Sequence, residues 1–315
     1  MIDPQDAIGL CLAGRISPQV ALCRLLLGGG DPGTIAAAVA ERRPAEPQPR
    51  WDALHALLDG HGAMLARLAS EVGRHGGNHA AIGAPHAPPD ASPAAASAAG
   101  IAAFFDNAVA FSPEASVALY SLGDPAILAQ ATAEIVAWLE RHACVAAPGA
   151  APSADMLDLG CGIGRLAIAL APRCRSVLGL DVSAGMVAEA RTRCAPFPNI
   201  RVETTPGTDL DALPSAAFDL ILAVDSMPYL VQIGPDALAT HVAGAARILR
   251  PGGRLAILNL SFGRPLAQDV AELAALAARH GFATEVAGER PFALWDAAAF
   301  LLRRDAPAAT PETPS

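Results

Sequence analysis

The chain has 315 residues and a formal net charge of −9, and 52% of its residues are hydrophobic but only 4% aromatic. This size and apolar content suit one complete α/β domain plus a smaller helical region. The basic residues are all Arg, which excludes phosphate binding by a P-loop Lys and Schiff-base chemistry, and the acidic balance argues against a nucleic-acid partner.

The cysteines are scattered, without a C-x-x-C pair or a His at metal-ligand spacing. We therefore expect reduced thiols, a cytoplasmic location and no metal site. No uninterrupted apolar run approaches the length of a membrane span, and the N-terminus lacks the basic and apolar regions of a signal peptide. A soluble protein without a membrane partner is expected.

Residues 1–75 are predicted to form a helical region. Three short helices are each indicated by a capping side chain followed by a Pro suited to the first helical position. The pairs are Asp3-Pro4, Ser17-Pro18 and Asp31-Pro32. Residues 51–75 have apolar residues at helical spacing and predict one long or broken helix. We interpret this region as a structural appendage, or else as a docking unit or the surface of a homodimer.

Residues 76–100 switch to Gly, Pro, Ala and Ser, the composition of a flexible linker. Residues 101–150 then return to helical signals. Ser112-Pro113 predicts a helix that runs to Ser121, and Asp124-Pro125 predicts another that runs to His142.

Residues 156–165, MLDLGCGIGR, combine a buried strand, a glycine-rich turn and the start of a helix. Glycines permit positive φ and let a ligand approach the backbone, which suits a nucleoside-bearing cofactor. The dinucleotide fingerprint G-x-G-x-x-G would need a glycine where this chain has Arg165. The pattern here is D-x-G-x-G-x-G instead.

This pattern resembles motif I of the class I S-adenosylmethionine-dependent methyltransferases. The resemblance implies S-adenosyl-L-methionine as the cofactor, with a set of residues around its methionine part and an acid that serves its amino group. That set is Asp158, Gly160, Cys161, Gly162 and Gly164.

A second acid supports the resemblance at the next predicted strand, residues 177–180. Asp181 ends this strand, where a doubly wound fold binds ribose hydroxyls. The resemblance assigns Asp181 to the ribose, adds Val182 to the cofactor site and places Met186 against the adenine. A glycine-rich turn without a cofactor is the alternative.

The remaining alternation of strands and helices favours a parallel α/β sheet. Strands are expected at 199–203, 219–225, 282–286 and 298–303 and within 246–260, and helices at 234–249 and 267–280. The resemblance implies a seven-stranded doubly wound sheet in the order 3-2-1-4-5-7-6, with the seventh strand antiparallel, in a methyltransferase domain at residues 151–304. Residues 305–315 are Pro-, Thr- and Ala-rich and are predicted to be a disordered tail.

The acceptor side has weaker signals. Asp225 ends its strand at the ligand crevice and is counted with both the cofactor-binding and the catalytic residues. The segment from Ser226 to Tyr229 matches only the second half of the Asn/Asp-Pro-Pro-Tyr/Phe motif of amide and base N-methyltransferases, so a small-molecule acceptor is favoured over a nucleobase or glutamine. The resemblance also places Asp209 near the adenine amine.

The family's small-molecule members carry lid helices before the first strand, so the resemblance makes residues 101–150 a lid. Tyr120 in this lid joins Asp225 and Tyr229 as a catalytic candidate, because a phenol with an apolar body and a polar tip suits a pocket wall. In the alternative interpretation, Asp225 and Tyr229 merely finish their strand.

The sequence therefore predicts an enzyme that transfers a methyl group from S-adenosylmethionine to a small-molecule acceptor at O, N, S or C. A methyltransferase for a protein or peptide docked by the N-terminal helices, and a cofactor-binding regulator without turnover, stay open as alternatives. Because a linker separates residues 1–99 from the rest, we expect them to be dispensable for cofactor binding.

Overall fold

The computed structural model describes residues 4–74 and 97–305. Its centre is a seven-stranded sheet in the order β3-β2-β1-β4-β5-β7-β6. Strand β7 pairs antiparallel with both β5 and β6, whereas the other neighbours run parallel. The predicted fold class, strand order and antiparallel seventh strand are confirmed. The predicted linker at 76–100 lies mostly outside the described residues, and so does the predicted tail beyond residue 305.

The central strands are apolar along most of their length because helices cover both faces of the sheet. Every residue of β1 except Asp155 is buried, and the last five residues of β2 are buried too. The strands are β1 Ala154–Leu159, β2 Cys174–Asp181, β3 Ile200–Thr204, β4 Phe218–Val224, β5 Leu249–Leu258, β6 Phe282–Glu289 and β7 Ala299–Arg304.

Strand β2 begins three residues before the predicted start at residue 177. Two of its first three residues, Arg175 and Ser176, are polar and exposed, so the apolar pattern of the sequence did not include this part of the strand. Arg175 Nε donates to Asp155 Oδ1 at 2.9 Å, and Ser176 Oγ donates to the same oxygen at 2.7 Å. These side-chain bonds hold the polar end of β2 against β1.

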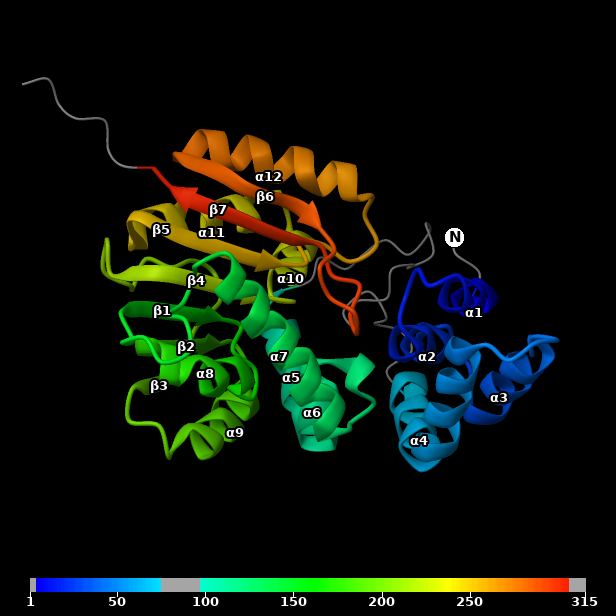
Figure 1. Cartoon of the computed structure of the whole chain (residues 1–315). Helices are drawn as coiled ribbons and strands as arrows, with labels where there is room; N and C mark the ends of the chain where they lie inside the picture. Colours follow the sequence, from blue (N-terminus) through cyan, green and yellow to red (C-terminus); the bar gives the residue numbers. More distant parts are fainter. Residues whose placement is uncertain (1–3, 75–96, 306–315) are drawn as a thin grey trace, which may run out of the picture.

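Helices cover the two faces of the sheet as separate layers. On one face lie α7 Pro125–Arg141, α8 Arg165–Leu170 and α9 Ala184–Cys194, and on the other α10 Met227–Ile233, α11 Pro235–Ile248 and α12 Leu266–His280 (Figure 1). Each layer has its own core, the first containing Leu222 and the second Ile221. Neighbouring residues of β4 serve different cores because successive side chains of a strand point to opposite faces.

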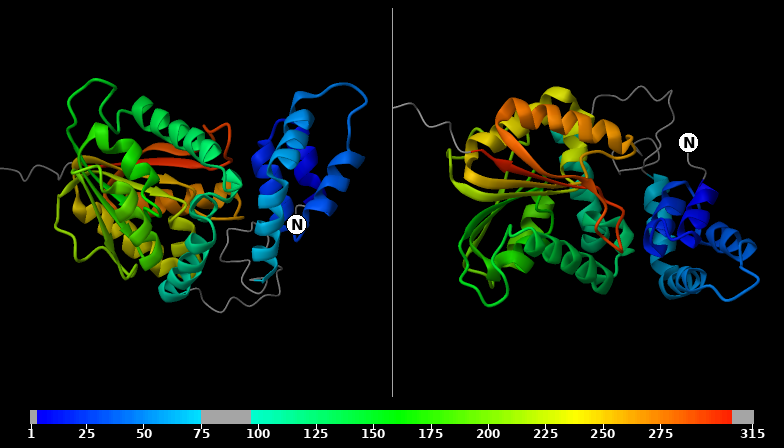
Figure 2. Two further views of the ribbon diagram at one scale, coloured as in Figure 1. Left: turned by 90° about the horizontal axis from the view of Figure 1, so that it is seen from below. Right: turned by 45° about the horizontal axis from the view of Figure 1, so that its top comes forward.

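The N-terminal helices form a bundle beyond the carboxyl ends of the parallel strands (Figure 1), and Figure 2 shows it from two further directions. They are α1 Pro4–Leu12, α2 Pro18–Leu27, α3 Pro32–Glu41 and α4 Pro49–Arg74. Two predicted caps form, since Ser17 Oγ accepts from the Val20 amide at 3.1 Å and Asp31 Oδ1 accepts from the Gly33 amide at 2.8 Å. The predicted long helix is continuous because its apolar residues share one buried face. These residues are Leu54, Leu58, Leu65 and Leu68.

The segment before β1 forms α5 Ala98–Phe111, α6 Pro113–Val117 and the short 3-10 helix η2 Leu119–Ser121. The predicted continuous helix from Ser112 to Ser121 is therefore wrong. Ala118 is extended, with φ of −163° and ψ of 91°, and it separates α6 from η2. This break turns the chain so that Tyr120 is buried.

None of the described helices is long and apolar enough to cross a membrane. All the cysteines are free thiols. Within residues 4–74 and 97–305, no three His, Cys, Asp or Glu side chains gather closely enough to hold a metal ion.

Leu222 lies fully buried at the centre of β4. We expect Leu222→Ala to lower the free energy of unfolding by about 2–5 kcal/mol, because the truncated side chain leaves a cavity in a packed core. Urea denaturation followed by circular dichroism measures this loss. Ile127→Ala, at a half-buried position of α7, is the control and should cost much less. Equal losses in the two variants would contradict the placement of this core.

Candidate functional site

The turn after β1 approaches two neighbouring elements closely. Gly160 and Gly162 have positive φ, 78° and 53°. A Cβ on Gly160 would lie 2.6 Å from the Cβ of Ser226, and a Cβ on Gly162 would lie 2.5 Å from Cγ1 of Val117. Because glycine has no Cβ, the turn can pack against the end of β4 and against α6.

Hydrogen bonds tie this turn to the end of β2. The Gly160 amide donates to the Leu180 carbonyl at 2.8 Å. The Gly162 amide donates to Asp181 Oδ2 at 2.8 Å, and the Ser183 amide donates to Asp181 Oδ1 at 2.9 Å. Burial raises the pKa of Asp181, and these backbone bonds act against the rise. Each carboxylate oxygen keeps a lone pair with which Asp181 can accept from ribose hydroxyls.

Asp158 is a buried acid two residues before Gly160. Its Oδ2 has no hydrogen-bond partner among the described residues. Burial raises its pKa to about 7; the charge of Arg165 acts in the opposite direction, and that of Asp181 adds to the rise. A buried polar atom without a partner is costly, and an ammonium group would satisfy it. The residues of the turn therefore fit the methionine end of S-adenosylmethionine, which carries an amino group.

A recess of about 80 Å³ lies beside Asp181 and the loop after β3. The predicted cofactor residues Val182 and Asp209 line it, together with His241 of α11. Burial lowers the pKa of His241, so its ring is neutral near pH 7. Nothing in the sequence around His241 indicated that this face of α11 reaches the recess.

Met186 and Gly164 have different surroundings. Met186 lines the cavity that begins at the glycine turn, with Ser116 Oγ 3.9 Å from its sulfur. Gly164 lines neither hollow. A Cβ there would lie 2.7 Å from Cys194 Sγ, so the missing side chain serves the packing of α9 against α8. Gly164 stays in the turn, since its amide donates to the Cys161 carbonyl at 2.9 Å, but neither Gly164 nor Asp158 is among the residues that line the two hollows.

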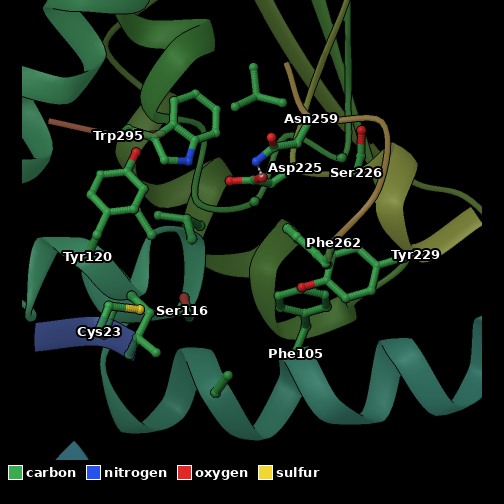
Figure 3. Close-up of a pocket in the computed structure, with 18 of the residues that line it drawn as sticks. Cys23, Phe105, Ser116, Tyr120, Asp225, Ser226, Tyr229, Asn259, Phe262 and Trp295 are labelled. Atoms are coloured by element: carbon green, nitrogen blue, oxygen red, sulfur yellow. Dashed lines mark hydrogen bonds between the residues drawn. The ribbon is translucent and has the colours of Figure 1, made fainter. Parts of the chain in front are cut away.

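The cavity at the glycine turn has a volume of about 480 Å³ and runs along the carboxyl ends of β4 and β5. Its walls come from distant parts of the chain. Tyr120 belongs to η2, Trp295 to the loop between β6 and β7, and Cys23 to α2 (Figure 3). The three predicted catalytic residues, Tyr120, Asp225 and Tyr229, all line this one cavity.

Asp225 lies near the middle of the cavity with an unusual backbone. Its φ is 54°, and its amide donates to the Leu258 carbonyl at 3.0 Å, which fixes it at the end of β4. Asn259 Nδ2 donates to Asp225 Oδ1 at 2.8 Å (Figure 3). Burial raises the pKa of Asp225 to about 7, while the Asn259 bond and the charge of Arg165 act to lower it. Asp225 can therefore exchange a proton near neutral pH.

The two tyrosines stay protonated. Tyr120 stacks on Trp295 with ring centroids 5.8 Å apart, and its hydroxyl has no hydrogen-bond partner among the described residues. Tyr229 lies edge-on between Phe105 and Phe262, with centroids at 5.2 and 5.7 Å. Burial raises the pKa of each phenol well above its ordinary value. They can orient a bound molecule by hydrogen bonding, but they do not serve as bases near pH 7.

Arg165 brings a positive charge to the cavity wall. Its Nη1 donates to Thr132 Oγ1 at 2.9 Å. No acid of the described chain lies within 4.0 Å of its guanidinium. This residue follows the glycine turn directly and can pair with a carboxylate of a bound molecule. Sequence analysis used it only to exclude the dinucleotide fingerprint.

Asp106 joins helix α5 to the start of α9. Ser183 Oγ donates to Asp106 Oδ1 at 2.6 Å, and the Gly185 amide donates to the same oxygen at 2.8 Å. These bonds lower the pKa of Asp106. Its negative charge also lies at the positive end of the α9 dipole, which favours it further. Helix α5 is thus joined to the segment that follows Asp181. Nothing in the sequence around Asp106 indicated this contact.

Known proteins share the segment that carries the glycine turn. A family profile described as "Methyltransferase domain" matches residues 156–253, which include β1, the turn, β2 and β4. This segment, residues 156–253, is a methyltransferase domain of the class I S-adenosylmethionine-dependent type. S-adenosylmethionine is the cofactor of this methyltransferase family, as the pattern of the turn predicted.

Curated proteins match a similar length of the chain. A demethylmenaquinone methyltransferase of Tropheryma whipplei is 35% identical over 124 residues, which is 39% of this chain and 49% of the relative. A trans-aconitate 2-methyltransferase of Deinococcus radiodurans is 40% identical over 111 residues, 34% of this chain and 38% of the relative. The chain thus spans half or less of the length of these relatives.

Solved methyltransferase structures resemble the chain at lower identity. Phosphoethanolamine N-methyltransferase 1 of Haemonchus contortus is 17% identical with a TM-score of 0.48, covering 67% of this chain and 50% of its own. Magnesium protoporphyrin IX methyltransferase of Synechocystis is 21% identical with a TM-score of 0.41, covering 56% and 79%.

Replacing Asp181 tests the ribose assignment. We expect Asp181→Ala to weaken S-adenosylmethionine binding about ten- to a hundredfold, because charge-assisted hydrogen bonds and the anchor of the Gly162 amide are lost together. Isothermal titration calorimetry measures the affinity. Glu203→Ala, which removes an acid from the neighbouring strand β3, should leave it unchanged. Wild-type affinity in a cooperatively melting Asp181→Ala variant would show that this acid does not hold the ribose.

Proposed function

We propose that this protein transfers the methyl group of S-adenosylmethionine to a small-molecule acceptor bound in the 480 Å³ cavity. The observation that carries the proposal is the continuity of that cavity from the glycine turn to Asp225, which provides neighbouring places for a donor and an acceptor. Its volume lies in the range of pockets that enclose small molecules. The two curated relatives are named for small acceptors, demethylmenaquinone and trans-aconitate, which supports the same class.

The residues on the cofactor side bind and orient. When bound, S-adenosylmethionine supplies a methyl group attached to a positively charged sulfur. The neutral thioether that remains after transfer is a good leaving group, so the enzyme has mainly to align donor and acceptor. Asp158 would satisfy the amino group, Asp181 the ribose, and the backbone of the Gly160–Gly162 turn allows close approach. Val182, Asp209 and Met186 would surround the adenine.

Asp225 is the group that handles the proton on the acceptor side. Its buried carboxyl, with a pKa of about 7, would take the proton that an acceptor hydroxyl or amine loses as it is methylated. Asn259 holds one carboxylate oxygen and so acts as a positioning residue. The ring of Tyr229 contacts those of Phe105 and Phe262, and this aromatic group would exclude water from its part of the cavity.

The proposal also includes a cytoplasmic location and no nucleic-acid partner, as the composition indicates. A homodimer through the N-terminal helices stays a prediction. Many apolar side chains of those helices are buried in a core that is continuous with one face of the sheet.

Incubation with methyl-labelled S-adenosylmethionine and a small-molecule cell extract tests the proposed activity. We expect a labelled small product with the wild-type chain and much less of it with Asp181→Ala at a donor concentration below that needed to saturate the variant, because that variant binds the donor poorly. Label found only on added protein would favour a protein acceptor. Bound donor without any labelled product from small-molecule or protein fractions would favour a regulator without turnover.

The pH dependence of turnover tests the role of Asp225. A carboxyl with a pKa of about 7 is mostly protonated below that pH and cannot accept a proton, so kcat/KM should fall about tenfold per pH unit below 7 and level off above it. Asn259→Ala removes a bond that lowers the pKa of Asp225, so the fall should begin at a higher pH. Asp225→Asn should lose most of the rate together with this pH limb. An unchanged profile in Asp225→Asn would assign the proton transfer to another group.

A further inference from the structure

We propose that helix α2 of the N-terminal bundle is a wall of the acceptor cavity and selects a flat, ring-bearing, mostly apolar acceptor. The proposal rests on the proposed function and names the acceptor class for that site. It makes the N-terminal bundle part of the acceptor site rather than an appendage. The proposal concerns the acceptor alone. Residues 1–99 are still expected to be dispensable for cofactor binding.

Helix α2 reaches the cavity with one face. Val20, Cys23 and Leu27 line the cavity from positions three and four residues apart, which is the spacing of a single helix face. The same helix packs against η2, which carries Tyr120. None of these α2 residues lines the recess beside Asp181, so this wall lies away from the predicted adenine site.

Two polar contacts join α2 to the loop that carries Trp295. Ser17 Oγ, at the start of α2, donates to the Leu294 carbonyl at 2.7 Å, and both residues are buried. Arg24 forms an ion pair with Asp296 at 2.7 Å. The residues on either side of Trp295 are therefore held by α2, while Trp295 itself lines the cavity. The helix thereby helps to fix an aromatic ring of the site.

The α7 helix holds the same loop from a second direction. Glu134 Oε2 accepts from the amides of Ala293 and Leu294 at 3.0 and 3.2 Å. Trp295 is thus kept in an aromatic cluster, with its ring centroid 5.8 Å from that of Tyr120 and 5.2 Å from that of Phe292. Tyr120 and Trp295 line the cavity, so this fixed cluster offers a ring-bearing molecule an aromatic contact area at low entropic cost.

The side chains that α2 turns to the cavity are mostly small and apolar. Burial raises the pKa of Cys23 to about 12, so its thiol stays neutral and behaves as a small hydrophobe beside Val20 and Leu27. Arg24 of the same helix also lines the cavity, but its charge is paired with Asp296. Other polar groups of the lining include Asp225, Arg165 and the unpartnered hydroxyl of Tyr120. An acceptor ring would therefore fit between α2 and Trp295, with the group to be methylated directed toward Asp225.

Filling the space beside α2 tests this assignment in the full chain. The probe is 8-anilinonaphthalene-1-sulfonate, a ring-bearing, largely apolar molecule with one sulfonate, whose fluorescence rises when it binds an apolar site. We expect Cys23→Trp to weaken probe binding at least about tenfold, because the new ring occupies the site, while S-adenosylmethionine affinity stays within about threefold. Cys23→Ala should keep probe binding. Ala37→Trp, at an exposed position of α3, is the matched control and should change neither affinity.

Leu27→Trp is a second filling variant, at a half-buried position, and should also weaken probe binding. It keeps the test decisive if Cys23→Trp does not fold.

The ion pair of α2 with the Trp295 loop gives a further test. Arg24→Ala should weaken probe binding about threefold or more, because it loosens that loop, whereas Arg15→Ala, at an exposed Arg of the same bundle, should not. Wild-type probe affinity in a cooperatively melting filling variant would overturn the proposal. A different result would separate this proposal from the proposed function. If the wild-type chain bound no S-adenosylmethionine but the filling variants still lost the probe, the proposed function would be refuted, and α2 would still be a wall of the cavity.

Discussion

The site depends on the joint between the glycine turn and the end of β2. The amides of Gly160 and Gly162 bond to Leu180 and Asp181, and these bonds are possible because the glycines adopt positive φ and present no Cβ to Ser226 or Val117. This single joint sets the separation between the methionine and ribose ends of the predicted cofactor site. It also determines how closely helix α6 can approach, since Val117 packs directly on the turn.

Around this joint the fold keeps two carboxyl groups in surroundings that disfavour their charge. Asp158 and Asp225 are both buried deeply enough for their pKa values to rise to about 7, and only Asp225 has a side-chain partner, Asn259. Such groups cost folding free energy unless a ligand completes them, and they are common at sites that bind cations or move protons. A positively charged cofactor near both acids is consistent with that arrangement.

The large cavity is composite. The end of β4 provides Asp225, η2 provides Tyr120, and helix α2 provides Cys23. The segment around Trp295 connects these parts, because α2 and α7 both bond to it. In a fold whose sheet and turn serve one cofactor, variation of such added helices is a way to change the acceptor without disturbing donor binding.

The sequence by itself determined the features whose causes are local. Asp158 and the alternating glycines predicted the turn, Asp181 predicted the end of β2, and the Ser-Pro and Asp-Pro pairs predicted helix starts, because each depends on neighbouring backbone geometry. Only the tertiary structure decided which distant residues complete the site. Asn259 lies 34 residues from Asp225, Asp106 lies 77 residues from Ser183, and Ser17 lies 277 residues from Leu294. Such pairs are set by packing across the sheet and between domains, and no short-range pattern records them.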